Sequence, residues 1–574
     1  MITGFSTPTS LHHEVNQGSD GAQMKFALPA FRRSAEFLEW IIVAILATPS
    51  LFLLFTCPPL WRDTDGFNQI ASTFAPQGII HWLPGYCFFG RLIMIVGGVA
   101  GSLLTGHGIP YLSIGTPTLN DAGIYLLIIF QHALLVTSLW YLVEVLTDRF
   151  WLKLAFAGFL VLTPWLYLFA HCIGSEAFSN SLLILTIANC WRCLKVPNPG
   201  RRVIGGYFVF LLLAALTRQL NALLAIAMPL TLLILAAISS IQAFTGTPNV
   251  PEIAGSSTER RTLNPGREFF ARKFAIFFGL SALAVMGSIA VQMGMCRAFR
   301  LPFRTTFGRT FEWRLRYLAS LPADDRTRLL NRFSSELDDP MLSSALSALN
   351  DSLARDPDWK ALFLFQNLDR QLEAAGETNQ QIRYYQADLK LNKLARHFLF
   401  PPEANYLRAV WTDVKKAPFV SQSELSRSPF YTTTVLQKEL EGPRYVRLRP
   451  LATFQHPPSF FIRTWEQGPY FHALGWVPIP LLAGVAIILT IARWIFVPRD
   501  SEIVVGTVFV GVLILMGGLL TFANCASTNF DARYLLPVYS FLQIALMLSV
   551  SMMVSPRSPP YKSTSEFGLC PRTG

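Results

Sequence analysis

The sequence predicts an all-α polytopic membrane protein with about ten transmembrane helices, a long first external loop and a mainly helical external domain. Of its 574 residues, 52% are hydrophobic and only 15% are charged, and the mean hydropathy is +0.38. A soluble globular chain typically carries about 25% charged residues. The difference comes from apolar runs such as Phe274–Met295 and Ile503–Phe522, which are long enough to cross a bilayer core of about 30 Å as helices.

The membrane helices are predicted from apolar length. Residues 1–36 are expected to form a cytoplasmic tail; Met1–Ala30 has no compact apolar run ending in a small-residue cleavage site, so we expect no removable signal peptide. The predicted spans are Phe37–Cys57, Ile124–Leu146, Leu154–His171, Phe178–Leu194, Val203–Leu216, Leu220–Ile241, Phe274–Met295, Phe471–Val497, Ile503–Phe522 and Tyr534–Val554.

One further apolar segment, Cys87–Thr105, is short, rich in glycine and carries Arg91 near its start. If it does not span, the basic loops Asp148–Lys153, Arg192–Arg202 and Arg260–Lys273 all fall on the cytoplasmic side. If it does span, the most basic short loops lie outside, against the positive-inside rule. We therefore expect this segment to lie along the outer membrane interface or to dip into it.

The order of the apolar spans predicts the domain organisation. A membrane bundle, 37–296, contains the first external loop, 58–120; an external domain, 297–470, precedes C-terminal transmembrane helices, 471–554, and a cytoplasmic tail, 555–574. In the first half of the external domain, apolar residues recur at helical three- and four-residue steps. They are Leu329, Leu330, Phe333, Leu337, Met341, Leu342, Leu346, Leu349 and Leu353. The second half, Pro401–Pro469, is rich in proline and aromatic residues and predicts loops with a few short strands.

The net charge of +12 is compatible with nucleic-acid binding, but many of the basic residues flank apolar spans, where they set membrane orientation. We therefore expect membrane lipids and no nucleic acid as partners. The Cys190-Trp191-Arg192-Cys193 pattern closes an apolar span and has no second pair. It is interpreted as structural rather than as a redox or zinc site.

Four polar clusters fall at helix ends on the predicted outer face. The first is Arg62–Gly66, directly after the first span. Asp63 and Asp65 are separated by one residue, so their carboxylates point the same way in an extended loop, and partial shielding beside a membrane can raise the pKa of a carboxyl towards that of a general base. The alternative is a solvated turn. Asp-x-Asp can also bind a divalent cation, although two carboxylates are too few to define such a site.

His81, which lies outside the four clusters, and the second and third clusters, at Glu176 and Arg218, offer groups for substrate binding. His81 precedes a Trp-Leu-Pro-Gly-Tyr sequence that is ordinary for a membrane interface, or it is a second polar group of the site. Glu176 either caps a helix or contacts a substrate hydroxyl. Arg218 lies between two apolar runs with no acidic neighbour in sequence; it can snorkel to headgroups, yet its planar guanidinium suits a phosphate, which we favour.

The last cluster opens the final span. Asp531, Arg533 and Tyr534 are followed by Pro537, which we place one turn inside a helix that it bends. The simpler interpretation is a membrane anchor with an Asp–Arg pair.

In four places the chain resembles the GT-C superfamily of integral-membrane glycosyltransferases, which includes protein mannosyltransferases and lipid A aminoarabinose transferases. The matching stretches are Asp63-Thr64-Asp65, Leu83-Pro84-Gly85-Tyr86, Arg218, and Asp531-Ala532-Arg533-Tyr534-Leu535-Leu536-Pro537. The resemblance covers the membrane part of the chain. The Asp-x-Asp differs from the adjacent acidic pair of the mannosyltransferases, and 297–470 matches no family domain that we can name.

The resemblance implies a sugar donor linked to a polyprenyl phosphate and a glycan, lipid or protein acceptor on the external face. It assigns the catalytic base to Asp63 first and Asp65 second, and the lipid phosphate to Arg218 and Arg533. It also implies a bacterial inner membrane with the site facing the periplasm. The sequence thus predicts a membrane glycosyltransferase. The alternatives are a transporter or flippase of a lipid-linked glycan, in which ionisable groups lie near the midplane, and a non-catalytic assembly protein.

Overall fold

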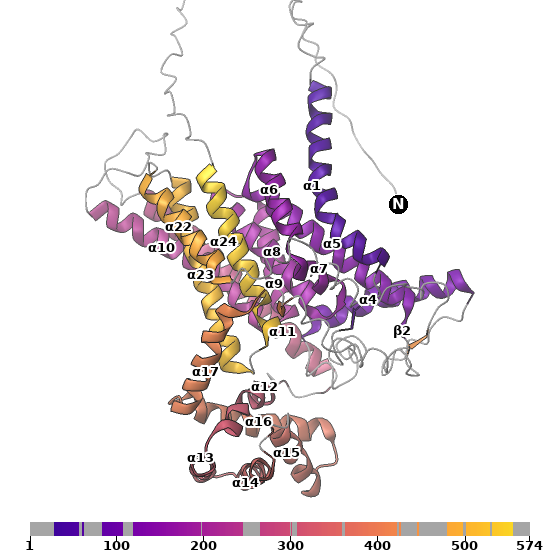
Figure 1. Ribbon diagram of the computed structural model, residues 1–574, viewed down its shortest axis with the longest axis vertical. Helices are drawn as coiled ribbons and strands as arrows, with labels where there is room; N and C mark the ends of the chain where they lie inside the picture. The colour runs from indigo at the N-terminus through magenta and orange to yellow at the C-terminus, as the bar shows by residue number, and fades with distance from the viewer. Residues whose placement is uncertain are drawn as a thin grey trace, which may run out of the picture.

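The structure, a computed structural model, contains a large helical bundle and a smaller helical domain below it in the view of Figure 1. It describes residues 28–56, 60–61, 83–106, 119–196, 198–244, 265–298, 300, 303, 307–356, 358, 362–421, 424–425, 445–446, 479–496, 501–528 and 531–554. The fold is that of an all-α polytopic membrane protein, as the sequence predicted.

The bundle is built from helices that coincide with most of each predicted span; Cys57 of the first span and residues 471–478 and 497 of the span Phe471–Val497 lie outside the described residues. These helices are α1 Leu28–Thr56, α4 Pro84–Thr105, α5 Asp121–Leu146, α6 Phe150–Val161, α7 Pro164–Ala170, α8 Ser175–Lys195, α9 Arg201–Thr217, η1 Gln219–Leu223, α10 Leu224–Phe244, α11 Pro265–Ala298, α22 Ile479–Phe496, α23 Ser501–Ser527, η5 Ala532–Leu535 and α24 Leu536–Val554.

Among the described residues, seven helices are long and apolar enough to cross a membrane, or up to eight if one bent pair counts as a single span. The predicted spans in α8, α9 and α22 are not among the seven. Helix α8 carries serine and asparagine along its length, and nearly all of it is buried among other helices. Its polar residues therefore face protein rather than lipid, which is where polar groups are tolerated inside a membrane.

The bent pair corrects the prediction of one continuous span over Leu154–His171. Helix α6 ends at Val161, and α7 begins at Pro164 with a bend of 65° between them. A proline has no backbone N–H and disfavours a helical conformation in the residue before it. The chain therefore breaks at Thr163 and restarts with Pro164 as the first residue of α7.

The segment predicted to lie at the interface forms a longer helix than the sequence indicated. Helix α4 begins at Pro84, has 22 residues, and by length and composition alone could cross a membrane. In Figure 1 it runs across the view, whereas α23 and α24 run along the long axis of the molecule. It packs closely on α5: a Cβ on Gly97 would lie 2.8 Å from the carbonyl oxygen of Ala122.

A separate group of helices follows α11 and has its own core. It falls within the predicted external domain, 297–470, and is called the extramembrane domain below. It comprises α12 Phe307–Arg314, η2 Leu315–Ser320, α13 Ala323–Leu337, α14 Pro340–Arg355, α15 Phe363–Ala374, α16 Gln380–Leu399, α17 Ala404–Lys416 and η3 Ala417–Phe419. The leucines predicted to repeat at helical spacing are buried in α13 and α14. The prediction of loops from Pro401 is wrong for α17, an amphipathic helix capped by Glu403, whose carboxylate accepts from the backbone N–H of Tyr406 at 2.6 Å.

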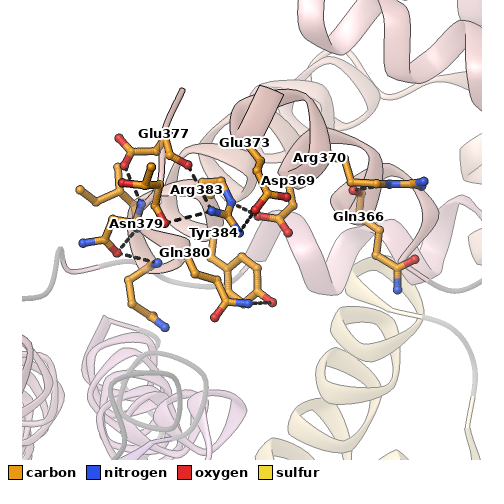
Figure 2. Close-up of polar contacts among 12 residues, drawn as sticks. Gln366, Asp369, Arg370, Glu373, Glu377, Asn379, Gln380, Arg383 and Tyr384 are labelled. Carbon is orange, nitrogen blue, oxygen red and sulfur yellow. Dashed lines mark hydrogen bonds and ion pairs between the residues drawn. The ribbon is translucent and has the colours of Figure 1, made fainter. Parts of the chain in front are cut away.

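An arginine holds α15 against α16 within this domain, as Figure 2 shows. The guanidinium of Arg383 donates to Asp369 at 2.8 Å, lies 3.4 Å from a carboxylate oxygen of Glu373, and donates to the carbonyl oxygen of Glu377 at 3.1 Å. These contacts join the end of α15, the turn and the first half of α16.

Two short parallel strand pairs connect distant parts of the chain. Strand β1, Leu60–Trp61, pairs with β3, Cys172–Ile173, with Trp61 opposite Ile173. Strand β2, Leu119–Asn120, pairs with β4, Tyr445–Val446. The first pair brings the start of the first loop beside the beginning of α8.

Candidate active site

An ion pair joins the beginning of α8 to the end of α9. Glu176 lies in the first turn of α8, where the helix dipole favours an acidic group, and Arg218 is the residue after α9. The Nη2 of Arg218 donates to Oε1 of Glu176 at 2.8 Å, and its Nε donates to the Ser175 hydroxyl at 3.4 Å. Glu176 is 2% exposed, whereas the Arg218 side chain is 21% exposed. The pair thus anchors a guanidinium that keeps part of its surface accessible.

Gly174, the residue before α8, leaves room for the carboxylate of this pair. A Cβ at this position would lie 2.7 Å from Oε2 of Glu176. Such a separation is shorter than real Cβ contacts, so a larger residue would push Glu176 away from its present position. The extended backbone at this position is open to any residue, so the glycine matters here for the space that it leaves to Glu176.

The second cluster lies in η5, between α23 and α24. The Asp531 carboxylate accepts from the backbone N–H of Arg533 at 3.0 Å and lies 2.9 Å from Nε of the same residue. Arg533 also donates to the hydroxyl of Tyr534 at 3.0 Å and stacks on its ring at 4.7 Å. The α-helix begins only at Leu536, so the predicted bend at Pro537 is wrong: the proline lies in the first turn, where a missing N–H breaks no helical hydrogen bond.

The two clusters lie near each other, because the starts of α24 and α8 are in contact: the hydroxyl of Ser540 in α24 donates to Oδ1 of Asn180 in α8 at 2.6 Å. Asp531 and Tyr534 also interact electrostatically with the guanidinium of Arg218. Asn524, near the end of α23, donates to the carbonyl oxygen of Tyr534 at 3.0 Å and so holds the η5 turn. Two residues further along α23, the carbonyl of Ala526 accepts from a tyrosine of α17, which puts the site at the end of the bundle that faces the extramembrane domain.

The start of α4 closes another side of this site. Gly85 packs so closely on the end of α9 that an added Cβ would lie 2.8 Å from the carbonyl carbon and oxygen of Leu216. The next residue, Tyr86, donates to Oε1 of Gln131 at 3.0 Å. Gln131 in turn donates to the carbonyl oxygens of Ala170 and Cys172, both at 2.9 Å. This network links α4 and α5 to the chain that leads into Glu176.

Sequence reasoning missed a buried polar network beside these contacts. His132 Nε2 lies 3.1 Å from Nδ1 of His171, and His132 Nδ1 lies 2.9 Å from the hydroxyl of Ser50. All three are buried within the bundle. The signal available in the sequence was the polar Gln131-His132 pair in the middle of the apolar span Ile124–Leu146.

The predicted catalytic residues Asp63 and Asp65, and the predicted binding residue His81, lie outside the described residues. In the described part of the chain, no three His, Cys, Asp or Glu side chains are grouped closely enough to hold a metal ion. Cys190 and Cys193 are free and buried in α8.

The fold and this site define an integral-membrane protein with a polar, partly buried centre at one end of its helical bundle. Comparisons with protein-family models and with curated proteins found no match. Among solved structures, the chain is similar to the apo crystal structure of the Archaeoglobus fulgidus oligosaccharyltransferase, with 9% sequence identity and a TM-score of 0.40. The alignment covers 89% of this chain and 50% of the other, so the chain spans about half the length of that protein.

Proposed function

We propose that the protein is a glycosyltransferase of the GT-C type. It transfers a sugar from a polyprenyl-phosphate-linked donor to a glycan, lipid or protein acceptor at the domain-facing end of the bundle. That end is the external, periplasmic face in our proposal, and the membrane is a bacterial inner membrane. The observation that carries the proposal is the meeting of Glu176, Arg218 and the Asp531–Tyr534 turn, three segments far apart in the chain, at one end of an apolar bundle. Charged groups are costly to place there without a function.

The strand pair β1–β3 supports Asp63 as a member of this site. Trp61 lies opposite Ile173, and Asp63 and Ser175 each follow two residues later. In our proposal, Asp63 serves the same site as Glu176 at the start of α8.

In the proposed reaction, Asp63 accepts the proton of an acceptor hydroxyl as that oxygen attacks the anomeric carbon of the donor sugar. The bond between the anomeric carbon and the phosphate oxygen breaks, and the electron pair leaves with the polyprenyl phosphate. Negative charge grows on the phosphate as this bond breaks, so positioned cations lower the barrier. Arg218 and Arg533 supply those cations, because a guanidinium can donate two parallel hydrogen bonds to a phosphate.

The carboxylates paired with these arginines have a positioning role. The described contacts of Arg218 use Nε and Nη2, so Glu176 fixes the guanidinium plane while other N–H groups remain directed away from the pair. Asp531 forms an ion pair with Arg533, with 2.9 Å between the carboxylate and Nε. Before the donor binds, each carboxylate neutralises the charge of its arginine. This lowers the free-energy cost of keeping the arginine partly buried at the end of the bundle.

The base is tested with Asp63→Asn in full-length protein reconstituted in liposomes. Mass spectrometry of the lipid that co-purifies with the wild-type protein first identifies the donor to be labelled. We expect Asp63→Asn to be folded and inserted but unable to release polyprenyl phosphate. Asp148→Asn serves as the control, because its side chain is 95% exposed in the loop between α5 and α6. Full activity of Asp63→Asn would contradict the proposed mechanism.

The phosphate site is tested by binding of farnesyl phosphate, a short polyprenyl phosphate. Arg218→Gln alone leaves Glu176 buried without its partner, which can cost about 3–5 kcal/mol and prevent folding. The double variant Glu176→Gln/Arg218→Gln removes both charges together and avoids that penalty. We expect it to fold and to bind farnesyl phosphate at least about tenfold more weakly, since a hydrogen bond to a charged group contributes about 1.5–3 kcal/mol. Unchanged binding would exclude Arg218 from the donor site.

The liposome assay also separates the enzyme from the transporter or flippase. Release of polyprenyl phosphate from labelled donor indicates transfer. Movement of intact donor between leaflets without release would instead favour transport and would contradict the proposal.

A further inference from the structure

A basic cleft lies between η2 and α17, where α17 packs against α23. Its volume is about 570 Å³, and a second cavity of about 490 Å³ shares Thr412 and Lys416 with it. The cationic residues that line the two cavities are Arg314, Arg316, Arg408, Lys415 and Lys416. The acidic residues are Asp413 and Glu424. The lining therefore has an excess of positive charge.

The acidic residues of this basic cleft already have partners within the protein. Asp413 forms an ion pair with the buried guanidinium of Arg314 and lies 3.5 Å from Nζ of Lys416. Glu424 accepts from the backbone N–H of Ser421 at 3.0 Å. Among the described residues that line the cleft, the surplus cations consequently have no competing carboxylate.

No described contact within the protein accounts for the presence of Arg316 and Arg408 in the cleft. Lys415 and Lys416 lie in the last turn of α17, where basic residues offset the helix dipole. Arg316 comes from η2 and Arg408 from the first half of α17, both are exposed, and neither forms an ion pair with another described residue. Two guanidinium groups from separate elements thus line one cavity.

The cleft lies where the chain passes from the extramembrane domain into the bundle. Trp411 is 56% exposed, with the ammonium of Lys415 over its ring at 5.7 Å, and Phe419 is 79% exposed. Directly afterwards Val420 is buried in the hydrophobic core of the bundle, and its carbonyl accepts from the Tyr539 hydroxyl at 2.6 Å. Exposed aromatic residues next to lysines at such a transition are typical of the headgroup region of a membrane.

We propose that the basic cleft binds the headgroup phosphate of an anionic phospholipid in the leaflet on the side of the domain. Arg316 and Arg408 donate to the phosphate oxygens, the Thr412 hydroxyl lies in the shared wall, and the acyl chains lie along Phe419 and the bundle. The bound lipid bridges η2 and α17 of the extramembrane domain, next to the point where the chain enters the bundle. This site uses none of the residues of the sugar-transfer site and does not depend on that function.

The test measures binding of dioctanoyl phosphatidylglycerol to the full-length protein in neutral detergent, by Trp fluorescence and by the rise in unfolding temperature. We expect saturable binding that weakens about tenfold or more in Arg316→Gln/Arg408→Gln, because two charge-assisted contacts are lost. The matched control is Arg328→Gln/Arg332→Gln, which removes the same charge from exposed positions of α13. It should bind like the wild type, and both double variants should retain wild-type binding of farnesyl phosphate at the transfer site.

Three results would overturn the inference. Equal affinity for dioctanoyl phosphatidylcholine, whose headgroup has a phosphate but no net charge, would mean that the cleft does not select an anionic lipid. Inorganic phosphate that displaces the lipid at equal concentration would identify a site for free anions. Equal weakening in the α13 control would mean that net charge, not the basic cleft, attracts the lipid.

Discussion

Replacement of Gly85 by alanine tests the close approach on which the geometry of the site depends. Gly85 lies in the first turn of α4, against the backbone at the end of α9. A Cβ there would meet the carbonyl carbon and oxygen of Leu216 at 2.8 Å and the nitrogen of Thr217 at 3.0 Å. These are backbone atoms, so no side-chain rotation relieves the contact. The helix start and the end of α9 must move apart.

The size of the movement follows from the contact distances. Ordinary van der Waals contact of a Cβ begins at 3.4 Å, so the two segments must separate by about 0.6 Å. Overpacking of this kind typically costs about 1–3 kcal/mol. Arg218 directly follows Thr217, and a comparable shift of its guanidinium would stretch its 2.8 Å hydrogen bond to Glu176 to the limit of such a bond. Misplacement of about 1 Å in an active site can reduce the rate about 100-fold.

The assay compares Gly85→Ala with Gly205→Ala in purified full-length protein. Gly205 lies in α9 itself, and a Cβ there would meet nothing within 4 Å. We expect the control to unfold at or above the wild-type temperature, since alanine favours a helix by about 1 kcal/mol over glycine. Gly85→Ala should unfold at a lower temperature and bind farnesyl phosphate about tenfold more weakly. If both variants unfold at the same temperature and bind alike, the close approach does not position Arg218.

Three further predictions concern separate parts of the molecule. Burial raises the pKa of Glu312, whose carboxylate caps α15, from 4.5 to about 7, so the folded state favours the protonated form. The extramembrane domain should therefore lose about 3 kcal/mol of stability as the pH rises from 4.5 to 7, and no more above pH 7. Denaturation curves of a Glu312→Gln variant should lack this dependence on pH. Tyr406→Phe removes the hydrogen bond to the carbonyl of Ala526 and should cost about 1 kcal/mol, with unchanged thermal stability contradicting it. Glu176→Gln should leave Arg218 charged but less firmly oriented, so that kcat falls more than the affinity for farnesyl phosphate; equal losses would assign Glu176 to binding instead.

Much of the helical architecture was accessible from local sequence. Apolar runs such as Ile503–Phe522 and the leucine spacing around Phe333 predict helices because both signals depend only on neighbours along the chain. In two places, two local patterns in the sequence favour different structures, and the pattern that dominates the prediction does not match the structure. Pro164 marks the break within the predicted span Leu154–His171, yet the apolar length outweighed it. The amphipathic pattern of Ala404–Lys416 was likewise hidden by nearby prolines and aromatic residues.

The sequence by itself determined that this is a helical membrane protein, and it placed Glu176, Arg218 and Asp531 at helix ends, where the structure has them. Only the tertiary structure decided which of them meet. Arg218 has no acidic neighbour along the chain, and its partner Glu176 lies 42 residues earlier. Gln131 joins the start of α4 to the chain before α8 across a similar separation. Such contacts depend on the angles at which helices cross, and these angles are set by side-chain packing over the whole bundle. A local stretch of sequence does not contain that information.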